Sequence, residues 1–202
     1  MKKLVRFIVA MFACAASLAG PVRAQELIGG HPPGVSGRYV QAVPAGDSRP
    51  EIGFSPEGSA YPLVMRVIDS AHRSLHVMAY EMKDAGIVRA LSEKAGRGVD
   101  VVVEVDYREN LGDGSSDFTR KRLSSLAASG ARVCVISAFP IFHDKVMIAD
   151  GRAVEFGSFN YTRSAKERNS ENAAVFWNNP AIATAYESHF QSRLSYCQWY
   201  HG

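Results

Sequence analysis

Apolar and polar residues follow two alternating periods along the chain from Glu51 onward. Short apolar runs such as "VDVVVEVDY" at 99–107 predict buried strands. Longer segments with one apolar face, such as "AYPLVMRVIDSAHR" at 60–73, predict amphipathic helices. Because strands and helices alternate in this way up to about residue 138, the pattern predicts an α/β fold with a mixed, partly parallel β-sheet.

The individual elements can be assigned from the same pattern. Strands are expected at 51–55, 74–82, 99–107 and 131–138, with helices at 60–73, 85–98 and 116–130 between them. The loop at 108–117 is rich in glycine and is expected to be irregular. In the second half we expect a β-hairpin formed by 144–150 and 152–160, a strand at 172–178 and a closing helix at 180–197. Pro180 suits the first turn of that helix.

The first 24 residues have the organisation of a secretory signal peptide. A basic start, "MKKLVR", precedes the apolar stretch "FIVAMFACAASLAG", and "VRA" places small residues before Gln25. A membrane anchor would need ~20 apolar residues, and the residues before Cys14 fit a lipoprotein signal poorly. We therefore expect cleavage after Ala24 and a periplasmic or secreted protein.

Three regions follow from composition. Residues 1–24 form the signal peptide, and residues 25–50 are rich in Gly, Pro and polar side chains, which indicates an extended N-terminal segment. Residues 51–202 are expected to form the folded domain. A chain of 202 residues suits one such domain with extensions.

Bulk charge does not indicate a nucleic-acid partner. The signal peptide holds four of the 23 basic residues and none of the 20 acidic ones, so the remainder carries 19 basic and 20 acidic residues, a net charge of −1. Only local clusters, such as "TRKR" at 119–122, are basic.

Two cysteines remain after the signal, Cys134 and Cys197. In an oxidising compartment they can pair, but a free buried thiol at Cys134 fits its strand equally well.

Three polar residues precede the apolar run 146–149 and raise the question of a site. Burying His143, Asp144 or Lys145 costs free energy unless a partner satisfies the polar group. Asp150-Gly151 is a strong signal for a two-residue hairpin turn. If Ala149 then pairs with Arg152, His143 falls opposite Ser158.

This register gathers complementary groups on one face of the hairpin, since side chains alternate between the faces of a strand. It places His143, Lys145, Ser158 and Asn160 together, whereas Asp144 points to the opposite face. Such a set suits an anion and above all a phosphoryl group. Lys145 can neutralise charge on phosphoryl oxygens, the hydroxyl and amide can donate hydrogen bonds, and the histidine can act as nucleophile or acid near neutral pH. Solvated polar residues at a strand end are the simpler alternative.

The same residues resemble the signature of a known family. His143, Lys145 and Asp150 spell H-x-K-x4-D, "GSFN" follows at 157–160, and Glu171 lies in "NSEN" before a strand. This pattern is similar to the HKD motif of the phospholipase D superfamily, and over residues 50–202 the chain most resembles the small, secreted, single-motif bacterial endonucleases of that superfamily. The resemblance implies a phospholipase D-like fold, with helices on both faces of the mixed sheet.

The resemblance also implies roles for individual residues. His143 would form a covalent phosphohistidine, and a second His143 from an identical subunit would protonate the leaving oxygen, so that one site is shared by a homodimer. Phe142 and Phe159 are candidates for contact with that second subunit. Lys145, Ser158 and Asn160 would hold the phosphate. Glu171 would accept a hydrogen bond from the histidine ring and fix its tautomer. The family needs no metal, and no cofactor is expected here.

Asp150 is interpreted differently, in spite of its place in the motif. It falls in the predicted hairpin turn, where aspartate is favoured for backbone reasons, so we expect a structural role.

The function indicated is metal-independent cleavage of nucleic acid, in particular non-specific endonuclease activity on DNA. A phospholipase D-type hydrolase acting on phospholipid, and a non-catalytic phosphate-binding module, are the alternatives.

Overall fold

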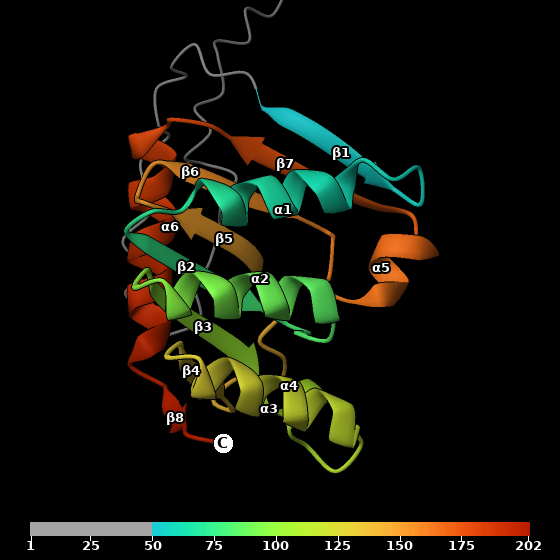
Figure 1. Cartoon of the computed structure of the whole chain (residues 1–202), viewed down its shortest axis with the longest axis vertical. Helices are drawn as coiled ribbons and strands as arrows, with labels where there is room; N and C mark the ends of the chain where they lie inside the picture. Colours follow the sequence, from blue (N-terminus) through green and yellow to red (C-terminus); the bar gives the residue numbers. More distant parts are fainter. Residues whose placement is uncertain (1–49) are drawn as a thin grey trace, which may run out of the picture. The chain divides into compact units, whose positions relative to one another are not determined.

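One sheet of eight strands organises the computed structural model, which describes residues 50–202 (Figure 1). The strand order is β1-β7-β6-β5-β2-β3-β4-β8, and only β2, β3 and β4 run parallel to one another. The strands are β1 (Glu51–Ser55), β2 (Ser74–Ala79), β3 (Asp100–Asp106), β4 (Arg132–Ile136), β5 (Lys145–Ala149), β6 (Ala153–Gly157), β7 (Glu171–Phe176) and β8 (Gln198–Tyr200). The predicted mixed sheet is thus confirmed.

Helices cover both faces of this sheet, as predicted. They are α1 (Ala60–Ser70), α2 (Ala85–Gly96), α3 (Tyr107–Asn110), α4 (Asp117–Ala128), α5 (Arg163–Glu167) and α6 (Pro180–Leu194). Helices α1, α2 and α4 lie side by side on one face, and α6 packs on the other (Figure 1). Short polar side chains cap the N-termini: Ser116 accepts a hydrogen bond from the backbone of α4 and Asn179 from that of α6.

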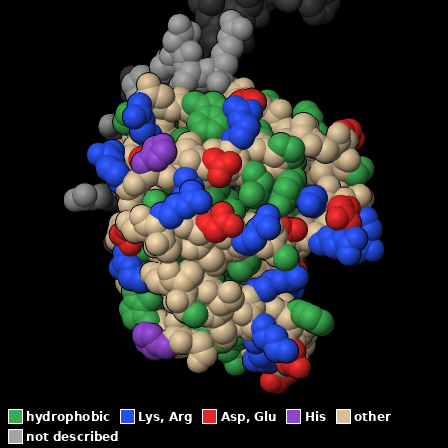
Figure 2. Space-filling model, viewed as in Figure 1, with side chains coloured by type: hydrophobic (Ala, Val, Ile, Leu, Met, Phe, Trp, Pro, Cys, Tyr) green, Lys and Arg blue, Asp and Glu red, His purple; other side chains and the backbone are tan. Residues whose placement is uncertain are grey.

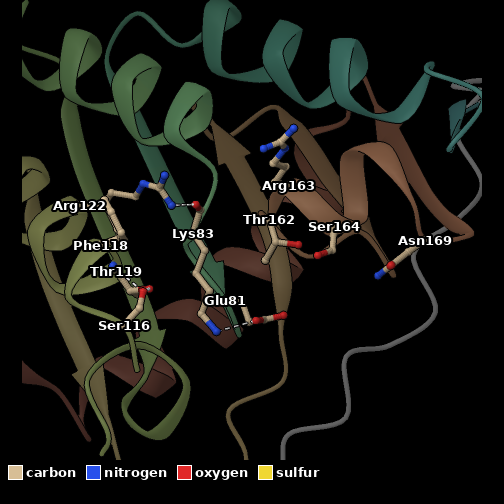
Figure 3. Close-up of a pocket in the computed structure, with 10 residues that line it drawn as sticks. All are labelled: Glu81, Lys83, Ser116, Phe118, Thr119, Arg122, Thr162, Arg163, Ser164 and Asn169. Carbon is tan, nitrogen blue, oxygen red and sulfur yellow. Dashed lines mark hydrogen bonds and ion pairs between the residues drawn. The ribbon is translucent and has the colours of Figure 1, made fainter. Parts of the chain in front are cut away.

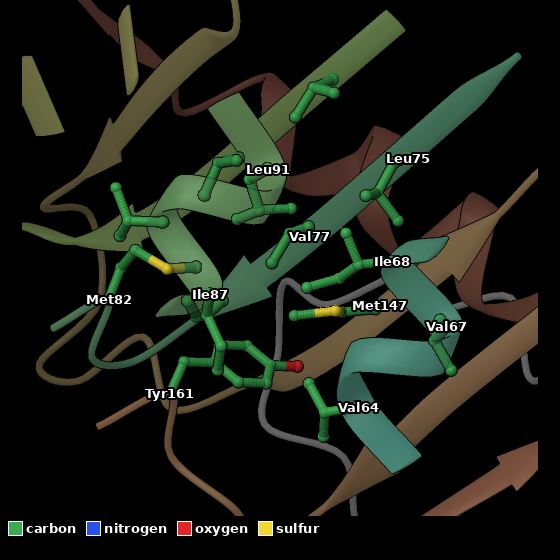
Figure 4. Close-up of a cluster of buried hydrophobic side chains, with 14 of the residues drawn as sticks. Val64, Val67, Ile68, Leu75, Val77, Met82, Ile87, Leu91, Met147 and Tyr161 are labelled. Atoms are coloured by element: carbon green, nitrogen blue, oxygen red, sulfur yellow. The ribbon is translucent and has the colours of Figure 1, made fainter. Parts of the chain in front are cut away.

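The alternation of side chains along the central strands divides the core into two clusters. The larger one lies between the sheet and α1, α2 and α4, and Figure 4 shows Ile68 of α1 between Leu75 of β2 and Met147 of β5. The smaller one lies beneath α6 and includes Phe190 and Val146. Strands β2 to β5 are therefore apolar on both faces, which explains their nearly continuous apolar sequences.

The hairpin of β5 and β6 differs from the predicted register by one residue. Asp150 and Gly151 form the turn with positive φ, and Arg152 N–H donates to the Ala149 carbonyl as a two-residue turn requires. The ladder nevertheless resumes with Ala149 opposite Ala153, not Arg152. The reason is that Arg152 is drawn out of the ladder: its side chain donates to Asn178 and its carbonyl accepts from Asn179 N–H. Lys145 consequently falls opposite Gly157 instead of Phe156.

Three short elements were not expected from the sequence. Helix α3 lies within the glycine-rich loop, α5 follows β6, and β8 adds an edge strand beside β4. Each has five residues or fewer, so none contains enough periods to produce a recognisable pattern. The residues matter nonetheless, because α3 and α5 lie next to the candidate site.

The predicted signal peptide and most of the segment 25–50 lie outside the described residues. The described part belongs to one compact unit of the chain. Within residues 50–202, no helix is long and apolar enough to cross a membrane.

A disulfide joins Cys134 of β4 to Cys197, which follows α6. Of the two alternatives open for these cysteines, the pair is the one formed. The bond spans 63 residues of sequence and ties the end of α6 and the edge strand β8 to the body of the sheet. A cross-link over a chain of this length restricts the unfolded state strongly.

We predict that Cys197→Ser lowers the free energy of unfolding by about 2–4 kcal/mol, because the unfolded chain regains the freedom that the cross-link removes. Urea denaturation of the oxidised wild type and the variant measures the difference. Adding a reductant should destabilise the wild type by a similar amount and leave the variant unchanged. Equal stabilities of variant and oxidised wild type would contradict the prediction.

Candidate functional site

The candidate residues come together at one edge of the sheet. This edge is formed by the C-terminal ends of β2, β3 and β6 and by the first residues of β5 and β7. Lys145 is the first residue of β5 and pairs with Ala79, the last residue of β2. In sheets with parallel strands, the crevice outside the carboxyl ends of those strands is the usual place for a ligand.

His143 and Lys145 both lie here against the ring of Tyr80. The His143 side chain is exposed, and its ring lies edge-on to the Tyr80 ring with the centroids 4.6 Å apart. Lys145 Nζ lies 5.1 Å from the centre of the same ring and donates a 2.8 Å hydrogen bond to the His143 carbonyl. Tyr80 thus positions both residues of the motif, leaving the imidazole open to solvent.

Lys145 is a largely buried cation, with 8% of its surface exposed. Burial lowers the pKa of Lys145, and the nearby carboxylates of Asp144, Glu81 and Glu171 oppose that effect. The ammonium group therefore has little water around it and lies in the field of several acids. A cation in such a place interacts strongly with an anion that enters the site, since its charge is poorly screened.

Ser158 and Glu171 are joined by a short hydrogen bond. Ser158 Oγ donates to Glu171 Oε2 at 2.6 Å and accepts from Asn172 N–H at 3.0 Å. Asn169 Nδ2 donates to the other carboxylate oxygen of Glu171 at 3.0 Å. Among residues 50–202, the Glu171 carboxylate is thus bonded to Ser158 and Asn169 and not to the ring of His143, so the expected orienting bond is not formed in this structure.

Asn160 follows in the same segment, which bends away from β6 after Gly157. Its Oδ1 atom is fully buried and has no hydrogen-bond partner within the described residues. Its backbone carbonyl accepts a hydrogen bond at 2.7 Å from the N–H group of Thr162, and Thr162 caps the N-terminus of α5. The hydrogen-bond donor of the Asn160 side chain is its Nδ2 group, since an amide oxygen only accepts.

The five predicted residues thus lie at one edge of the sheet. The hairpin ladder does not align them in the way that was expected. The one-residue shift puts Ser158 out of phase with Lys145, and the two residues are linked instead through Glu171, which is bonded to Ser158 and acts on the charge of Lys145. Phe142 and Phe159, which we expected to be available for contact with a second subunit, are 3% and 0% exposed. That expectation is wrong, because both side chains pack into the monomer core.

Tyr80 and the acidic network behind it were missed in the sequence. The Tyr80 hydroxyl donates to Glu109 Oε1 at 2.9 Å, and Lys83 Nζ bridges Glu109 and Glu81 at 3.0 and 2.7 Å. Burial and the bond to Glu109 raise the pKa of Tyr80 to about 12, so the phenol stays neutral. Tyr80 was read as part of a strand, and no local pattern indicates that it meets His143, 63 positions later.

Asp144, which lies within the motif, and Asp150, which is part of it, both point away from this edge. Asp144 Oδ2 lies 3.3 Å from His189 Nε2 of α6, on the opposite face of the sheet as expected. Asp150 lies at the far end of β5, where its carboxylate accepts hydrogen bonds from the backbone N–H groups of His72, Arg73 and Ser74 at 2.8–3.2 Å. It therefore joins the hairpin turn to the beginning of β2.

The arrangement is suited to an anion with several oxygens. One exposed imidazole, one buried ammonium and neutral hydroxyl and amide groups surround the sheet edge. Within residues 50–202, no three His, Cys, Asp or Glu side chains are placed to hold a metal ion. A nucleophile beside a fixed cation is what transfer of a phosphoryl group requires of a protein.

Comparison with known protein families and sequences gives a consistent result. A family model described as "Cardiolipin synthase, PLD-like domain" matches residues 64–194. A phospholipase D from Rickettsia bellii is 34% identical over 140 residues, which are 69% of this chain and 66% of that protein. A mitochondrial cardiolipin hydrolase from Chlamydomonas reinhardtii is 26% identical over 147 residues, 73% of this chain and 63% of the relative. The chain therefore spans slightly less than two thirds of the length of these curated relatives.

Solved structures agree with the sequence comparison. The crystal structure of Nuc from Salmonella typhimurium, described as a phospholipase D family member, is 40% identical and superposes with a TM-score of 0.73 over 77% of this chain and 100% of that one. NucT from Helicobacter pylori has a TM-score of 0.66 at 21% identity, covering 75% of this chain and 99% of that one. At this identity the second similarity concerns the fold alone.

We predict that Asp150→Asn lowers the free energy of unfolding by about 1–2 kcal/mol and leaves most of the activity, because the carboxylate holds three backbone amides and faces away from His143. Burial alone would raise the pKa of Asp150, but the three backbone hydrogen bonds outweigh it and lower the pKa below 3.8. The stabilisation is thus present above about pH 4 and is lost as the pH falls through the lower, folded-state pKa. Loss of turnover with unchanged denaturation would contradict a structural role.

Proposed function

Since the chain belongs to the phospholipase D family, a family of phosphodiester hydrolases, we propose that it is a metal-independent phosphodiesterase that cleaves nucleic acid, acting as a non-specific DNA endonuclease. The observation that carries this proposal is the exposed His143 imidazole beside the buried Lys145 ammonium at the sheet edge. The remaining residues of the site have the chemistry that such a pair needs.

The first step transfers the phosphoryl group to the protein. A ring nitrogen of His143 attacks phosphorus, a phosphorus–nitrogen bond forms, and the bond to the leaving oxygen breaks. A second histidine gives that oxygen a proton. Lys145, the Nδ2 group of Asn160, and Ser158 once its hydroxyl turns from Glu171 to the phosphate, donate to the non-bridging oxygens and stabilise the charge that develops on them. Nδ2 is the part of the Asn160 amide that can do this, because Oδ1 only accepts.

The second step releases the product. The histidine that lost its proton takes one from a water molecule, whose oxygen attacks phosphorus while the phosphorus–nitrogen bond breaks. His143 is then free again, and the proton balance is restored. No metal takes part, because Lys145 supplies the positive charge that a divalent ion would otherwise supply.

Glu171 acts in this proposal as a positioning residue. Its carboxylate holds Ser158 and favours the ammonium form of Lys145. The further role of fixing the tautomer of His143 stays a prediction.

The second histidine comes from an identical subunit in this proposal. A two-fold axis that passes His143 would bring two such residues into one site and make a homodimer, the commonest symmetric assembly. Exposed apolar side chains beside the site support it: Ile141 is 56% exposed two residues before His143, and Phe54 is 52% exposed on β1 opposite Asn172. They replace Phe142 and Phe159 as candidate contacts.

A phospholipid is the second candidate substrate, because curated relatives carry the names phospholipase D and cardiolipin hydrolase. The similarity to Nuc favours nucleic acid as the substrate, since the match covers 100% of the Nuc chain at 40% identity.

We also propose that the protein acts in the periplasm or outside the cell. The predicted signal peptide and the disulfide between Cys134 and Cys197 support an oxidising location.

The direct test is cleavage of plasmid DNA by the mature protein in excess chelator. We expect activity to persist, Lys145→Ala to reduce turnover about 10²- to 10³-fold, and His143→Ala to remove it, since each contributes charge or a bond only in the transition state. Arg97→Ala, an exposed cation after α2, is the matched control and should behave as wild type. Activity that is lost in chelator and restored by a divalent ion would refute the mechanism.

Mixed dimers test the shared site. We expect a purified heterodimer of wild-type and His143→Asn subunits to lose nearly all turnover, because both histidines serve one reaction. The protein should also sediment at twice its subunit mass. If the heterodimer keeps half of the wild-type activity, each subunit contains a complete site of its own and the shared mechanism is wrong.

A further inference from the structure

A pocket of about 380 Å³ opens next to the catalytic edge, and none of the proposed steps uses it. We call it the α4–α5 pocket. Its walls are the facing ends of α4 and α5, and the loop after β2 lies between them (Figure 3). Its lining includes Glu81, Lys83, Phe118, Arg122, Arg163 and Asn169.

Two residues of the lining connect the pocket to the candidate site. Asn169 lines it and donates a hydrogen bond to Glu171 at 3.0 Å. Glu81 also lines the pocket, and its carboxylate favours the charged form of Lys145. A polymer whose phosphodiester lies at His143 and Lys145 therefore has its neighbouring residue at the mouth of this pocket.

The lining carries three cations and one carboxylate. The Arg122 guanidinium donates to the Lys83 carbonyl, which holds it against the wall, and Lys83 Nζ lies 2.7 Å from Glu81 (Figure 3). Arg163 is on the opposite wall, where its side chain is 82% exposed and its Nε donates to Glu167 Oε2 at 2.8 Å. Figure 2 shows the surface hollowed between α5 and α4, with Lys and Arg side chains on both sides. The lining side chains are thus basic in formal charge, although Glu109 and Glu167, which lie outside the lining, pair with Lys83 and Arg163.

Phe118 is the unexplained residue of this pocket. It is 72% exposed on the first turn of α4, the most exposed large apolar side chain of the described residues. It also lines a second groove between α2 and α4, together with Arg89 and Lys121. An aromatic ring between two basic hollows has the composition of a platform on which a nucleobase stacks while cations hold the backbone.

We propose that the α4–α5 pocket binds the nucleotide next to the cleaved phosphodiester, with its base stacked on Phe118 and its phosphate between Arg122 and Arg163. The inference deepens the proposed function and rests on it. It also implies a preference for single-stranded over duplex nucleic acid. In a duplex the faces of each base are covered by neighbouring bases, so a protruding side chain can stack only on an unpaired base.

The chemistry of the lining favours a nucleotide over a lipid. Apart from Phe118, its walls consist of charged, hydroxyl and amide side chains. The acyl chains of a phospholipid require an apolar surface, and burying them against these groups would leave polar atoms without partners. A phospholipid is therefore an outcome that the test must be able to detect.

Binding and turnover of Phe118→Ala test the inference separately. Binding is measured by fluorescence anisotropy with a labelled 12-nucleotide single strand, in the inactive His143→Ala background. We expect Phe118→Ala to weaken binding about tenfold or more, Phe118→Trp to retain it, and Arg163→Gln to reduce the slope of log affinity against log salt by about 1. Tyr196→Ala, which removes an exposed aromatic ring that packs on Phe139, is the matched control and should bind as wild type.

Turnover is measured with the full-length mature protein on the single strand, on a duplex of the same sequence and on bis(p-nitrophenyl) phosphate, which has no flanking nucleotide. The inference is supported if Phe118→Ala raises the KM for the single strand about tenfold more than the KM for the duplex or for bis(p-nitrophenyl) phosphate. Equal effects on single strand and duplex, or no effect on binding, overturn the inference while the proposed function stands. An effect confined to phosphatidylcholine vesicles also overturns it. If the wild type binds the strand through Phe118 but cleaves none of the substrates, the proposed function fails and the binding site stands.

Discussion

The register between β2 and β5 is the constraint on which the site depends. These antiparallel strands are joined at both ends: Tyr80 N–H donates to the Asp144 carbonyl at 2.8 Å, and Asp150 N–H donates to the Ser74 carbonyl at 3.0 Å. Between these ends Lys145 faces Ala79. A slip of one residue would turn Lys145 toward α6 and away from the edge that holds Ser158 and Glu171. The hydrogen bonds of Asp150, far from the site, therefore help to determine which side of the sheet receives the cation.

A buried cation at the sheet edge is stable only because acids surround it. Asp144, Glu81 and Glu171 favour the charged form of Lys145, while Tyr80 covers it with the face of an aromatic ring. The acids are themselves held by other groups, since Glu81 is bonded to Lys83 and Glu171 to Ser158. His143 is left outside this network, with its ring exposed and its carbonyl tied to Lys145. The site thus combines a fixed electrostatic part and an accessible reactive group.

The regular elements and the site residues could be predicted from sequence because both depend on local patterns. Apolar periodicity identified the long elements, such as α1 and β3, and the spacing of His143, Lys145 and "GSFN" identified the motif and the family. What could not be predicted depends on contacts between distant segments. The hairpin ladder shifted because Arg152 bonds to Asn178 and Asn179, and no property of the hairpin itself indicates that contact.

The sequence by itself therefore determined the fold class, the family, the candidate groups for the chemistry and the two cysteines available for pairing. Only the tertiary structure decided how these groups meet. Tyr80 lies against His143, Cys134 pairs with Cys197, and Phe118 stands exposed beside a basic pocket. The physical reason is that hydrophobic periodicity and turn preference act over a few residues, whereas the site is assembled by strand pairing and burial between segments that are far apart in the chain.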